Sequence, residues 1–300
     1  MPVDRSSDSA VHHRSVQVDG LDIFYREAGP SNAPTLLLLH GFPTSSHMFR
    51  DLIPLLARDF HLVAPDYPGF GYSSAPAPAE FAYTFDHLAD VLEHFVDAAG
   101  LRRYALYMQD FGGPVGLRLA TRRPKAVSGL VVQNANAYRE GITPGLDAVV
   151  LRAWRERSAE TDANLRALFE MPTTRRQFLE GAVDPSRVSP DSWHHAQWGM
   201  ERPGNKAIQL ELHRNYGSNI ERYDEWHAYF RANTPPTLVV WGKNDFVFAA
   251  EGAAAYRQDL PHAEIHLLDA GHFALETHAT EIADRIRAFA PSFEGRRQGL

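Results

Sequence analysis

Short, mostly apolar runs alternate with amphipathic stretches along much of the chain. Segments such as Thr35–Leu39 and Thr237–Trp241 are nearly all apolar, whereas Phe85–Ala99 spaces its apolar residues as a helix does. Strands buried on both faces of a parallel sheet read as continuous apolar runs, and amphipathic helices cover both faces of such a sheet. The pattern therefore predicts an α/β fold with a mostly parallel, eight-stranded sheet and helices on both of its faces.

The expected elements follow from these runs and from the turn residues between them. The predicted strands are Ser15–Val18, Leu21–Arg26, Thr35–Leu39, His61–Ala64, Tyr104–Met108, Val127–Gln133, Thr237–Trp241 and Glu264–Leu268. The predicted helices of the sheet domain are Met48–Ala57, Phe85–Ala99, Gly112–Arg123, Ala249–Arg257 and Thr280–Phe289.

The alternation stops after Asn134 and resumes near Thr237. Residues 138–234 show helical patches, scattered Pro and Gly, and no run typical of a strand. A parallel sheet interrupted in this way is typical of a core domain that carries an inserted helical cap. The predicted organisation is a disordered leader at 1–14, an α/β core at 15–137 and 235–292, a helical cap at 138–234 and a frayed tail at 293–300.

The composition excludes several classes of protein. The 300 residues hold 30 Lys and Arg against 37 Asp and Glu, and a net charge of −7 disfavours a protein that coats nucleic acid. No apolar run approaches the ~20 residues that span a bilayer, and Met1–Arg14 lacks the apolar core of a secretory signal. The absence of cysteine excludes a disulfide framework, a thiolate nucleophile and a cysteine-ligated zinc. We expect a cytoplasmic protein with no nucleic-acid or membrane partner.

The 15 histidines raise the question of a metal site. Metal sites on helices favour close pairs on one face, as in His-Glu-x-x-His. His87 and His94 lie about two turns apart beside an amphipathic stripe, and the neighbours His194 and His195 point to different sides of any helix. We therefore expect no bound metal.

The strongest local signal is the segment Gln109-Asp110-Phe111-Gly112-Gly113, which joins a predicted strand to a predicted helix. A sharp strand-to-helix turn exposes a nucleophile and needs small residues around it, because its backbone packs closely. The nucleophile position holds Asp110. A carboxylate needs no general base at neutral pH, and by displacement at carbon it leaves an alkyl ester on the enzyme. The alternative interpretation is that Asp110 is a helix N-cap.

Other candidate groups also follow predicted strands. Asp245 and His272 come after the last two strands, so the chain order is nucleophile, acid, base. Open α/β sheets place their active sites at the carboxyl ends of their strands. After Thr35–Leu39, the segment His40–Pro43 offers backbone N–H groups for an oxyanion.

Taken together, these motifs resemble the α/β-hydrolase superfamily, specifically the aspartate-nucleophile branch that contains epoxide hydrolases and haloalkane dehalogenases. The similarity covers most of the chain and includes His40–Pro43, the loop Asp66–Ser73 and the turn around Asp110. The resemblance implies the α/β-hydrolase fold, no cofactor and a cis peptide bond within His40–Pro43. It also implies an oxyanion hole formed by the backbone N–H groups of Phe42 and Phe111.

The resemblance further implies a role for each of the three ordered residues. Asp110 would be the nucleophile and Asp245 the acid that orients the base. His272 would activate water for hydrolysis of the ester. No carboxylate occurs in the segment 134–137, where some dehalogenases carry their acid, so Asp245 has no rival.

The two activities of this branch need different groups around the leaving atom. Dehalogenases typically hold the halide with a Trp after the nucleophile and an Asn after His-Gly. Here Phe111 and Phe42 occupy those positions, and their side chains donate no hydrogen bond. A cap tryptophan such as Trp154 would remain as a donor.

Epoxide hydrolases instead protonate the leaving alkoxide with cap tyrosines, one of them in a Tyr-Arg-Asn motif. In this chain His213 stands where that tyrosine is expected. Tyr216 lies one helical turn further on, and Tyr138 opens the cap, so each is a candidate for the missing donor.

The sequence therefore predicts an epoxide hydrolase-like enzyme that uses water and a small, neutral, apolar organic substrate. Haloalkane dehalogenation is the alternative reaction. A small-molecule receptor on a hydrolase scaffold is the alternative of another class, since both leaving-group devices are incomplete in the sequence.

Overall fold

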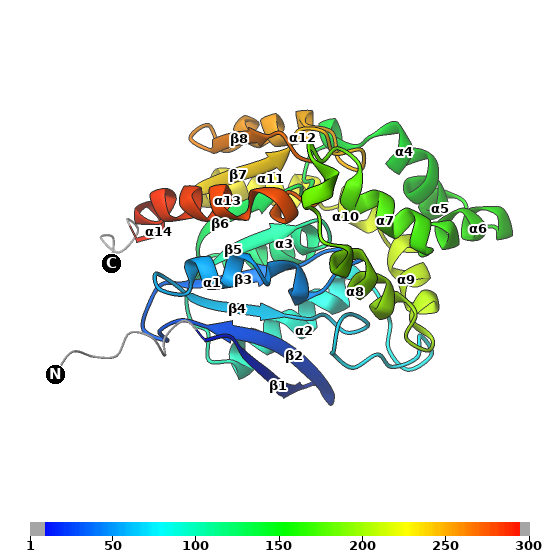
Figure 1. Cartoon of the computed structure of the whole chain (residues 1–300), viewed down its shortest axis with the longest axis horizontal. Coiled ribbons are helices and arrows are strands. Elements are labelled where there is room, and N and C mark those ends of the chain that lie inside the picture. Colours follow the sequence, from blue (N-terminus) through cyan, green and yellow to red (C-terminus); the bar gives the residue numbers. More distant parts are fainter. Residues whose placement is uncertain (1–9, 295–300) are drawn as a thin grey trace.

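An eight-stranded sheet forms the centre of the molecule in the computed structural model, which describes residues 10–294 (Figure 1). The strand order is β1-β2-β4-β3-β5-β6-β7-β8; the β1–β2 and β2–β4 pairs are antiparallel and the others are parallel. The predicted mostly parallel sheet is thus confirmed. The strands are β1 (His12–Val18), β2 (Leu21–Ala28), β3 (Thr35–Leu39), β4 (His61–Pro65), β5 (Tyr104–Gln109), β6 (Val127–Gln133), β7 (Thr237–Gly242) and β8 (Glu264–Leu268).

Helices cover both faces of the sheet, because successive side chains of each buried strand point to opposite faces. In β3, Leu37 and Leu39 pack in the cluster that contains the helices after β4 and β5, whereas Leu36 and Leu38 pack in the cluster of the opposite face. The first face carries α2 (Phe85–Ala98), α3 (Gly112–Arg122) and α12 (Glu251–Ala255), and the second carries α1 (Leu52–Leu56), α13 (Leu275–Phe289) and α14 (Pro291–Glu294).

Between β6 and β7 the described chain forms helices joined by loops and contains no strand, although Ile142 makes an isolated bridge to Phe248, which follows β7. Figure 1 shows α5 to α9 of this insert gathered at one end of the sheet, away from α14. We call residues 138–234 the cap segment. Its helices are α4 (Pro144–Leu146), α5 (Arg152–Arg155), α6 (Ala159–Ala167), α7 (Met171–Leu179), α8 (Pro190–Met200), α9 (Asn205–Arg214), α10 (Gly217–Ile220) and α11 (Tyr223–Asn233), with a π-helical segment at Asp147–Leu151 and 3₁₀ turns at Arg139–Gly141 and Pro185–Arg187.

Both predicted chain ends need correction. The leader was expected to be disordered to residue 14, but β1 begins at His12, where the ladder pairs His12 with Glu27. The tail was expected to fray from residue 293, but Phe293 is buried against Gly129, and Arg103 donates a hydrogen bond to its carbonyl. The remainder of the two predicted segments, residues 1–9 and 295–300, lies outside the described residues.

Two predicted helix boundaries also differ from the structure. The helix expected from Met48 to Ala57 divides into a 3₁₀ turn at Ser46–Phe49 and α1, which begins at Leu52. This division places Pro54 in the first turn of α1, where its missing N–H costs no hydrogen bond. Helix α13 begins at Leu275, before the expected Thr280, and contains a non-helical residue, His278.

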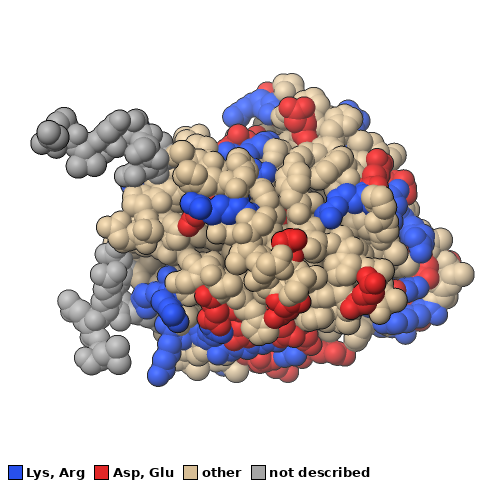
Figure 2. All heavy atoms as spheres, turned by 90° about the horizontal axis from the view of Figure 1, so that it is seen from below, with Lys and Arg blue, Asp and Glu red and all other residues tan. Residues whose placement is uncertain are grey.

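The surface carries charges of both signs. Figure 2 shows basic and acidic side chains interspersed on the viewed face, with uncharged surface between them. Within residues 10–294, no helix combines the length and apolar character needed to cross a membrane.

The position of Phe293 generates the first prediction. We expect Phe293→Ala to lower the free energy of unfolding by about 3 kcal/mol, because it leaves a cavity beside β6. The exposed neighbour is the control, and Ser292→Ala should change stability by less than about 0.5 kcal/mol. Urea unfolding of the three proteins measures both values; equal stabilities would contradict the packing role of Phe293.

Candidate active site

Asp110 sits at a tight turn between β5 and α3. Its backbone adopts a left-handed conformation with φ of 49°, which is unusual for a residue other than glycine. A side chain at Gly112 would bring its Cβ within 2.2 Å of the carbonyl oxygen of Leu39, so the glycine permits this close approach. Helix α3 begins at Gly112 with Phe111 as its N-cap residue, so the interpretation of Asp110 as the N-cap is wrong.

The carboxylate of Asp110 is buried and bonded to backbone. Its Oδ1 accepts a hydrogen bond of 2.7 Å from the N–H of Phe42, within the loop that contains the expected cis Phe42-Pro43 bond. Burial raises the pKa of Asp110 to about 6, against the opposing effects of His272 and of the N–H groups of Phe42 and Phe111. Both predicted oxyanion donors therefore lie at this carboxylate.

His272 lies between two carboxylates at the carboxyl end of the sheet. Its Nδ1 is 2.8 Å from Oδ2 of Asp245, and its Nε2 is 3.8 Å from Oδ2 of Asp110. Burial alone would lower the pKa of His272, but the charge and hydrogen bond of Asp245, with a contribution from Asp110, raise it. The structure thus brings together the three residues whose order in the chain predicted a triad.

Asn134 holds Asp245 in place, a contact that sequence reasoning missed. Its Nδ2 donates to Oδ2 of Asp245 at 2.8 Å, and its Oδ1 accepts from the N–H of Gly242 at 2.9 Å. The N–H of Val247 donates to the other oxygen of Asp245 at 2.7 Å. The left-handed Asn134 directly follows β6, and this position after a strand was the available signal.

Gln109 contacts the base from the position before the nucleophile. Its side-chain Nε2 is 3.0 Å from Nε2 of His272, while its Oε1 is buried without a hydrogen-bond partner. The two ends of an amide have nearly the same shape, and with Oε1 toward His272 the amide oxygen would accept a hydrogen bond from the ring N–H. The side chain therefore adds a polar neighbour to the nitrogen that faces Asp110.

A cavity of about 290 Å³ opens above Asp110, between the sheet and the cap segment. His213 and Tyr216, two of the candidate substrate-binding residues of the cap segment, line it. Tyr138 and Trp154 do not: the Tyr138 hydroxyl donates to Asp259, and the Trp154 ring packs against Gly217. The other lining side chains are mostly apolar, namely Phe42, Phe111, Leu146, Val149, Val150, Leu168, Phe246, Val247 and Phe248, together with Thr173, Arg176 and Gln177.

His213 and Tyr216 offer different polar groups to this cavity. His213 Nδ1 lies 2.8 Å from the carbonyl of Gln209, so this nitrogen carries the proton and Nε2 is an acceptor. Burial lowers the pKa of His213 to about 4, which keeps the ring neutral. The Tyr216 hydroxyl has no hydrogen-bond partner among the described residues, and burial raises its pKa well above the usual value, with Asp110 contributing. Tyr216 is thus a protonated donor near Asp110.

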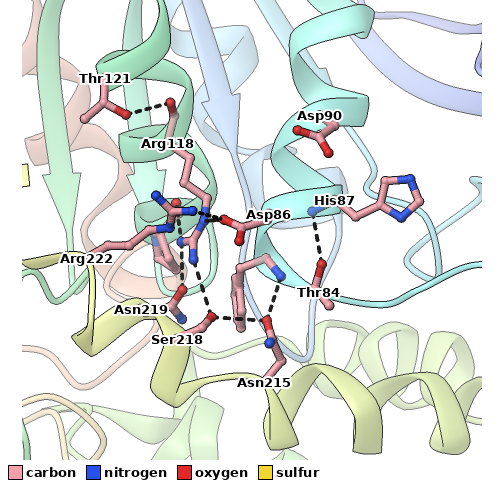
Figure 3. A network of polar contacts seen from close by, with 12 residues as sticks. Thr84, Asp86, His87, Asp90, Arg118, Thr121, Asn215, Ser218, Asn219 and Arg222 are labelled. Atoms are coloured by element: carbon pink, nitrogen blue, oxygen red, sulfur yellow. Dashed lines mark hydrogen bonds and ion pairs between the residues drawn. The ribbon is translucent and has the colours of Figure 1, made fainter. Parts of the chain in front are cut away.

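A buried arginine ties this part of the cap segment to α3. Arg118 donates to Asp86 of α2 at 2.6 Å and to Asn219 of the cap segment at 2.7 Å, with Ser218 at 3.4 Å (Figure 3). In the same network, Asn215 accepts a hydrogen bond of 2.9 Å from the first N–H of α2. Since Tyr216 lies between these cap residues in the chain, the network fixes the backbone that carries it.

The described part of the chain contains no set of residues suited to bind a metal ion. Within residues 10–294, no group of three His, Cys, Asp or Glu side chains lies close enough together to hold an ion.

The chain is similar to known proteins over most of its length. A family model described as the alpha/beta hydrolase fold matches residues 34–279. A Saccharomyces cerevisiae protein named as an uncharacterized hydrolase is 38% identical over 277 residues, which cover 91% of this chain and 95% of the relative. Mouse epoxide hydrolase 3 is 26% identical, over 93% of this chain and 77% of its own. The haloalkane dehalogenase DbeA of Bradyrhizobium elkani superposes with a TM-score of 0.78 and 27% identity, covering 95% of this chain and 99% of that one.

The chain therefore belongs to the α/β-hydrolase fold family. Within that family it is a hydrolase of the aspartate-nucleophile type, with haloalkane dehalogenases and epoxide hydrolases among its relatives.

The raised pKa of Asp110 predicts a stability cost that grows with pH. Unfolding returns the carboxyl to its ordinary pKa near 4, so ionisation of the folded protein costs stability as the pH rises from about 4 through about 6. Asp110→Asn keeps the acceptor for Phe42 but removes the charge. We expect it to be more stable than the wild type by about 2–3 kcal/mol at pH 8 and nearly equal to it at pH 4.

Urea unfolding at both pH values measures this difference. Asp191→Asn, at an exposed carboxylate, is the control and should change stability by less than about 0.5 kcal/mol at either pH. A stabilisation by Asp110→Asn that is the same at both pH values would contradict the role of the buried charge.

The Arg118 network predicts unequal roles for two arginines that share Asp86. Arg118→Ala should lower the free energy of unfolding by about 3–5 kcal/mol, because it leaves buried polar groups unpaired. Arg222 contacts the same carboxylate at 2.9 Å but is partly exposed, so Arg222→Ala should cost less than about 1 kcal/mol. Equal losses of the free energy of unfolding in the two variants, measured with urea, would contradict a larger contribution from the buried Arg118.

Proposed function

We propose that the protein hydrolyses small, mostly apolar epoxides through a covalent ester on Asp110. The observation that carries this proposal is the set of donors around the cavity. Tyr216 offers a phenol with no hydrogen-bond partner among the described residues, whereas Phe42 and Phe111 stand where a halide would need donors. The neutral His213 presents an acceptor and gives a leaving anion nothing to bind.

The first step forms the ester. Oδ1 of Asp110 is engaged by the N–H of Phe42, so Oδ2 is the attacking atom. As Oδ2 bonds to an epoxide carbon, the carbon–oxygen bond of the ring breaks and the electron pair goes to the epoxide oxygen. Tyr216 gives its proton to that oxygen, and its phenolate regains a proton after the second step, when water has added one to the carboxyl group of Asp110. The raised pKa of Tyr216 keeps the phenol protonated at neutral pH, and an alkoxide is basic enough to take its proton.

The second step hydrolyses the ester. His272 Nε2 takes a proton from a water molecule, which attacks the carboxyl carbon of Asp110, and the N–H groups of Phe42 and Phe111 bind the oxyanion that forms on Oδ1. Collapse breaks the bond between that carbon and the substrate oxygen, and the proton from His272 completes the diol. Esterification also removes the negative charge of Asp110, one of the groups that raise the pKa of His272, so the pKa of the imidazole falls when a base is needed.

The relatives support the reaction class and leave two alternatives. The names epoxide hydrolase and haloalkane dehalogenase both occur among them, so dehalogenation is the second candidate. A receptor role remains the alternative of another class, and it predicts ligands that raise the melting temperature without being consumed. Halide and diol measurements on a panel of haloalkanes and epoxides separate the three.

The ester mechanism predicts where the oxygen from water goes. In a single turnover in ¹⁸O-water, we expect the label in Asp110 and unlabelled oxygen in the product, because water attacks the carboxyl carbon. His272→Gln should accumulate the alkyl-enzyme, visible as a mass increase equal to the epoxide. His278→Gln, outside the cavity, is the control and should turn over normally. Label found only in the diol would refute the covalent route.

The role of Tyr216 predicts a contrast between two tyrosines. Tyr216→Phe should lower kcat/KM for an epoxide by about 10²-fold or more, the usual effect of losing a positioned acid. Tyr138→Phe removes a hydroxyl that donates to Asp259 away from the cavity, and should change kcat/KM less than about twofold. Steady-state rates on one epoxide measure both variants, and similar values for the two would overturn the assignment of Tyr216.

A further inference from the structure

One wall of the cavity is a face of α7. Thr173, Arg176 and Gln177 line the cavity, and their spacing of three and four residues places them on the same side of the helix. Tyr216 belongs to a different part of the cap segment, after α9. The end of α7 packs on the loops of the triad instead, where Phe178 stacks on Phe273 at 4.2 Å and Gly181 lies against Gly271.

Gln177 is the unsatisfied member of this wall. The Thr173 hydroxyl donates to the carbonyl of Ala167 at 2.9 Å, and the Arg176 guanidinium pairs with Glu180 and lies 4.2 Å from the centre of the Phe246 ring. The side chain of Gln177 has no hydrogen-bond partner among the described residues, although only 6% of the residue is exposed.

A buried amide without a partner lacks the hydrogen bonds that it makes in water. A second buried glutamine in the cap segment shows the usual arrangement, since Gln197 accepts from Thr174 and donates to the carbonyl of Phe169. Gln177 differs because it lines the cavity, whose other lining side chains, such as Leu168 and Phe248, are mostly apolar. A ligand in the cavity is therefore its available partner.

The same surroundings restrict the charge of that ligand. An ionised substituent would lose its hydration in the apolar cavity, and Arg176 is already paired with Glu180. A neutral group such as a hydroxyl loses less, and an amide can both donate a hydrogen bond to it and accept one from it.

We propose that Gln177 makes the cavity selective for epoxides that carry a neutral hydrogen-bonding group, such as a hydroxyl, on the chain away from the ring. This inference rests on the proposed epoxide hydrolysis, which it deepens. The epoxide oxygen faces Tyr216 on one wall, and the polar substituent faces Gln177 on the α7 wall. A site built in this way disfavours the analogue that lacks the substituent, because the amide is then left unpaired.

A matched pair of substrates tests the proposal. The pair is 1,2-epoxyhexane and its analogue with a hydroxyl on the far terminal carbon, and the protein pair is the wild type and Gln177→Met, which has similar length and no amide. We expect the wild type to favour the hydroxylated epoxide at least tenfold in kcat/KM. Gln177→Met should lose at least tenfold on that substrate and change less than threefold on epoxyhexane.

Thr173→Val is the matched control on the same helix face. It removes a hydroxyl that is already bonded within the protein, so it should leave the ratio of the two kcat/KM values within twofold of the wild type. An equal loss on both substrates in Gln177→Met would overturn the proposal, since it would mean that Gln177 acts at the reacting centre. An unchanged preference would overturn it as well.

Binding of the products separates this inference from the proposed function. The hexane diol and triol that correspond to the two epoxides need no turnover, and calorimetry gives their affinities for the wild type and for Gln177→Met. If the wild type hydrolyses neither epoxide, the proposed function is overturned. Binding of the triol that is tighter than that of the diol, and that Gln177→Met abolishes, would still support the role of Gln177. Equal affinities of the wild type for diol and triol would overturn that role.

Discussion

The burial of two carboxylates around one imidazole is the constraint on which the site depends. Asp110 and Asp245 both lie in the interior, and His272 is within 3.8 Å of an oxygen of each. Buried charges cost several kcal/mol unless they are paired and hydrogen-bonded. The turn at the end of β5, the N–H of Phe42 and the amide of Asn134 each meet part of that requirement. The hydrogen bonds around the triad thus stabilise its buried charges in the absence of substrate.

Much of the fold was readable from the sequence because parallel strands buried on both faces have a distinctive apolar pattern. The limits of β3, β6 and β8 agree with the predicted residues. The start of β1 was missed because its first residues are exposed and polar, and their pairing with β2 leaves no hydrophobic signal. Phe293 was missed because its partner, Gly129, is distant in the chain.

The triad was predictable for a different reason, since its members each follow a strand of one sheet. Because the carboxyl ends of these parallel strands lie at the same edge of the sheet, Asp110, Asp245 and His272 come together there. No such rule holds in the cap segment, whose helices pack by side-chain shape. There the sequence offered Tyr216 and Tyr138 equally, and only Tyr216 lines the cavity. Gln177 gave no signal at all, because a glutamine on an amphipathic helix has no distinctive pattern.

The buried Arg118 has a consequence for how this enzyme can diversify. It joins the core to the cap segment together with two other arginines: Arg50 donates to Ser192 of α8, and Arg202 donates to the carbonyl of Gly71. None of the three lines the cavity. Part of the attachment of the cap segment is consequently carried by residues that lie outside the pocket wall. Substitutions on the cavity face of α7 leave these three arginine contacts in place, so the wall of the cavity can change while the arginines still hold the cap segment to the core.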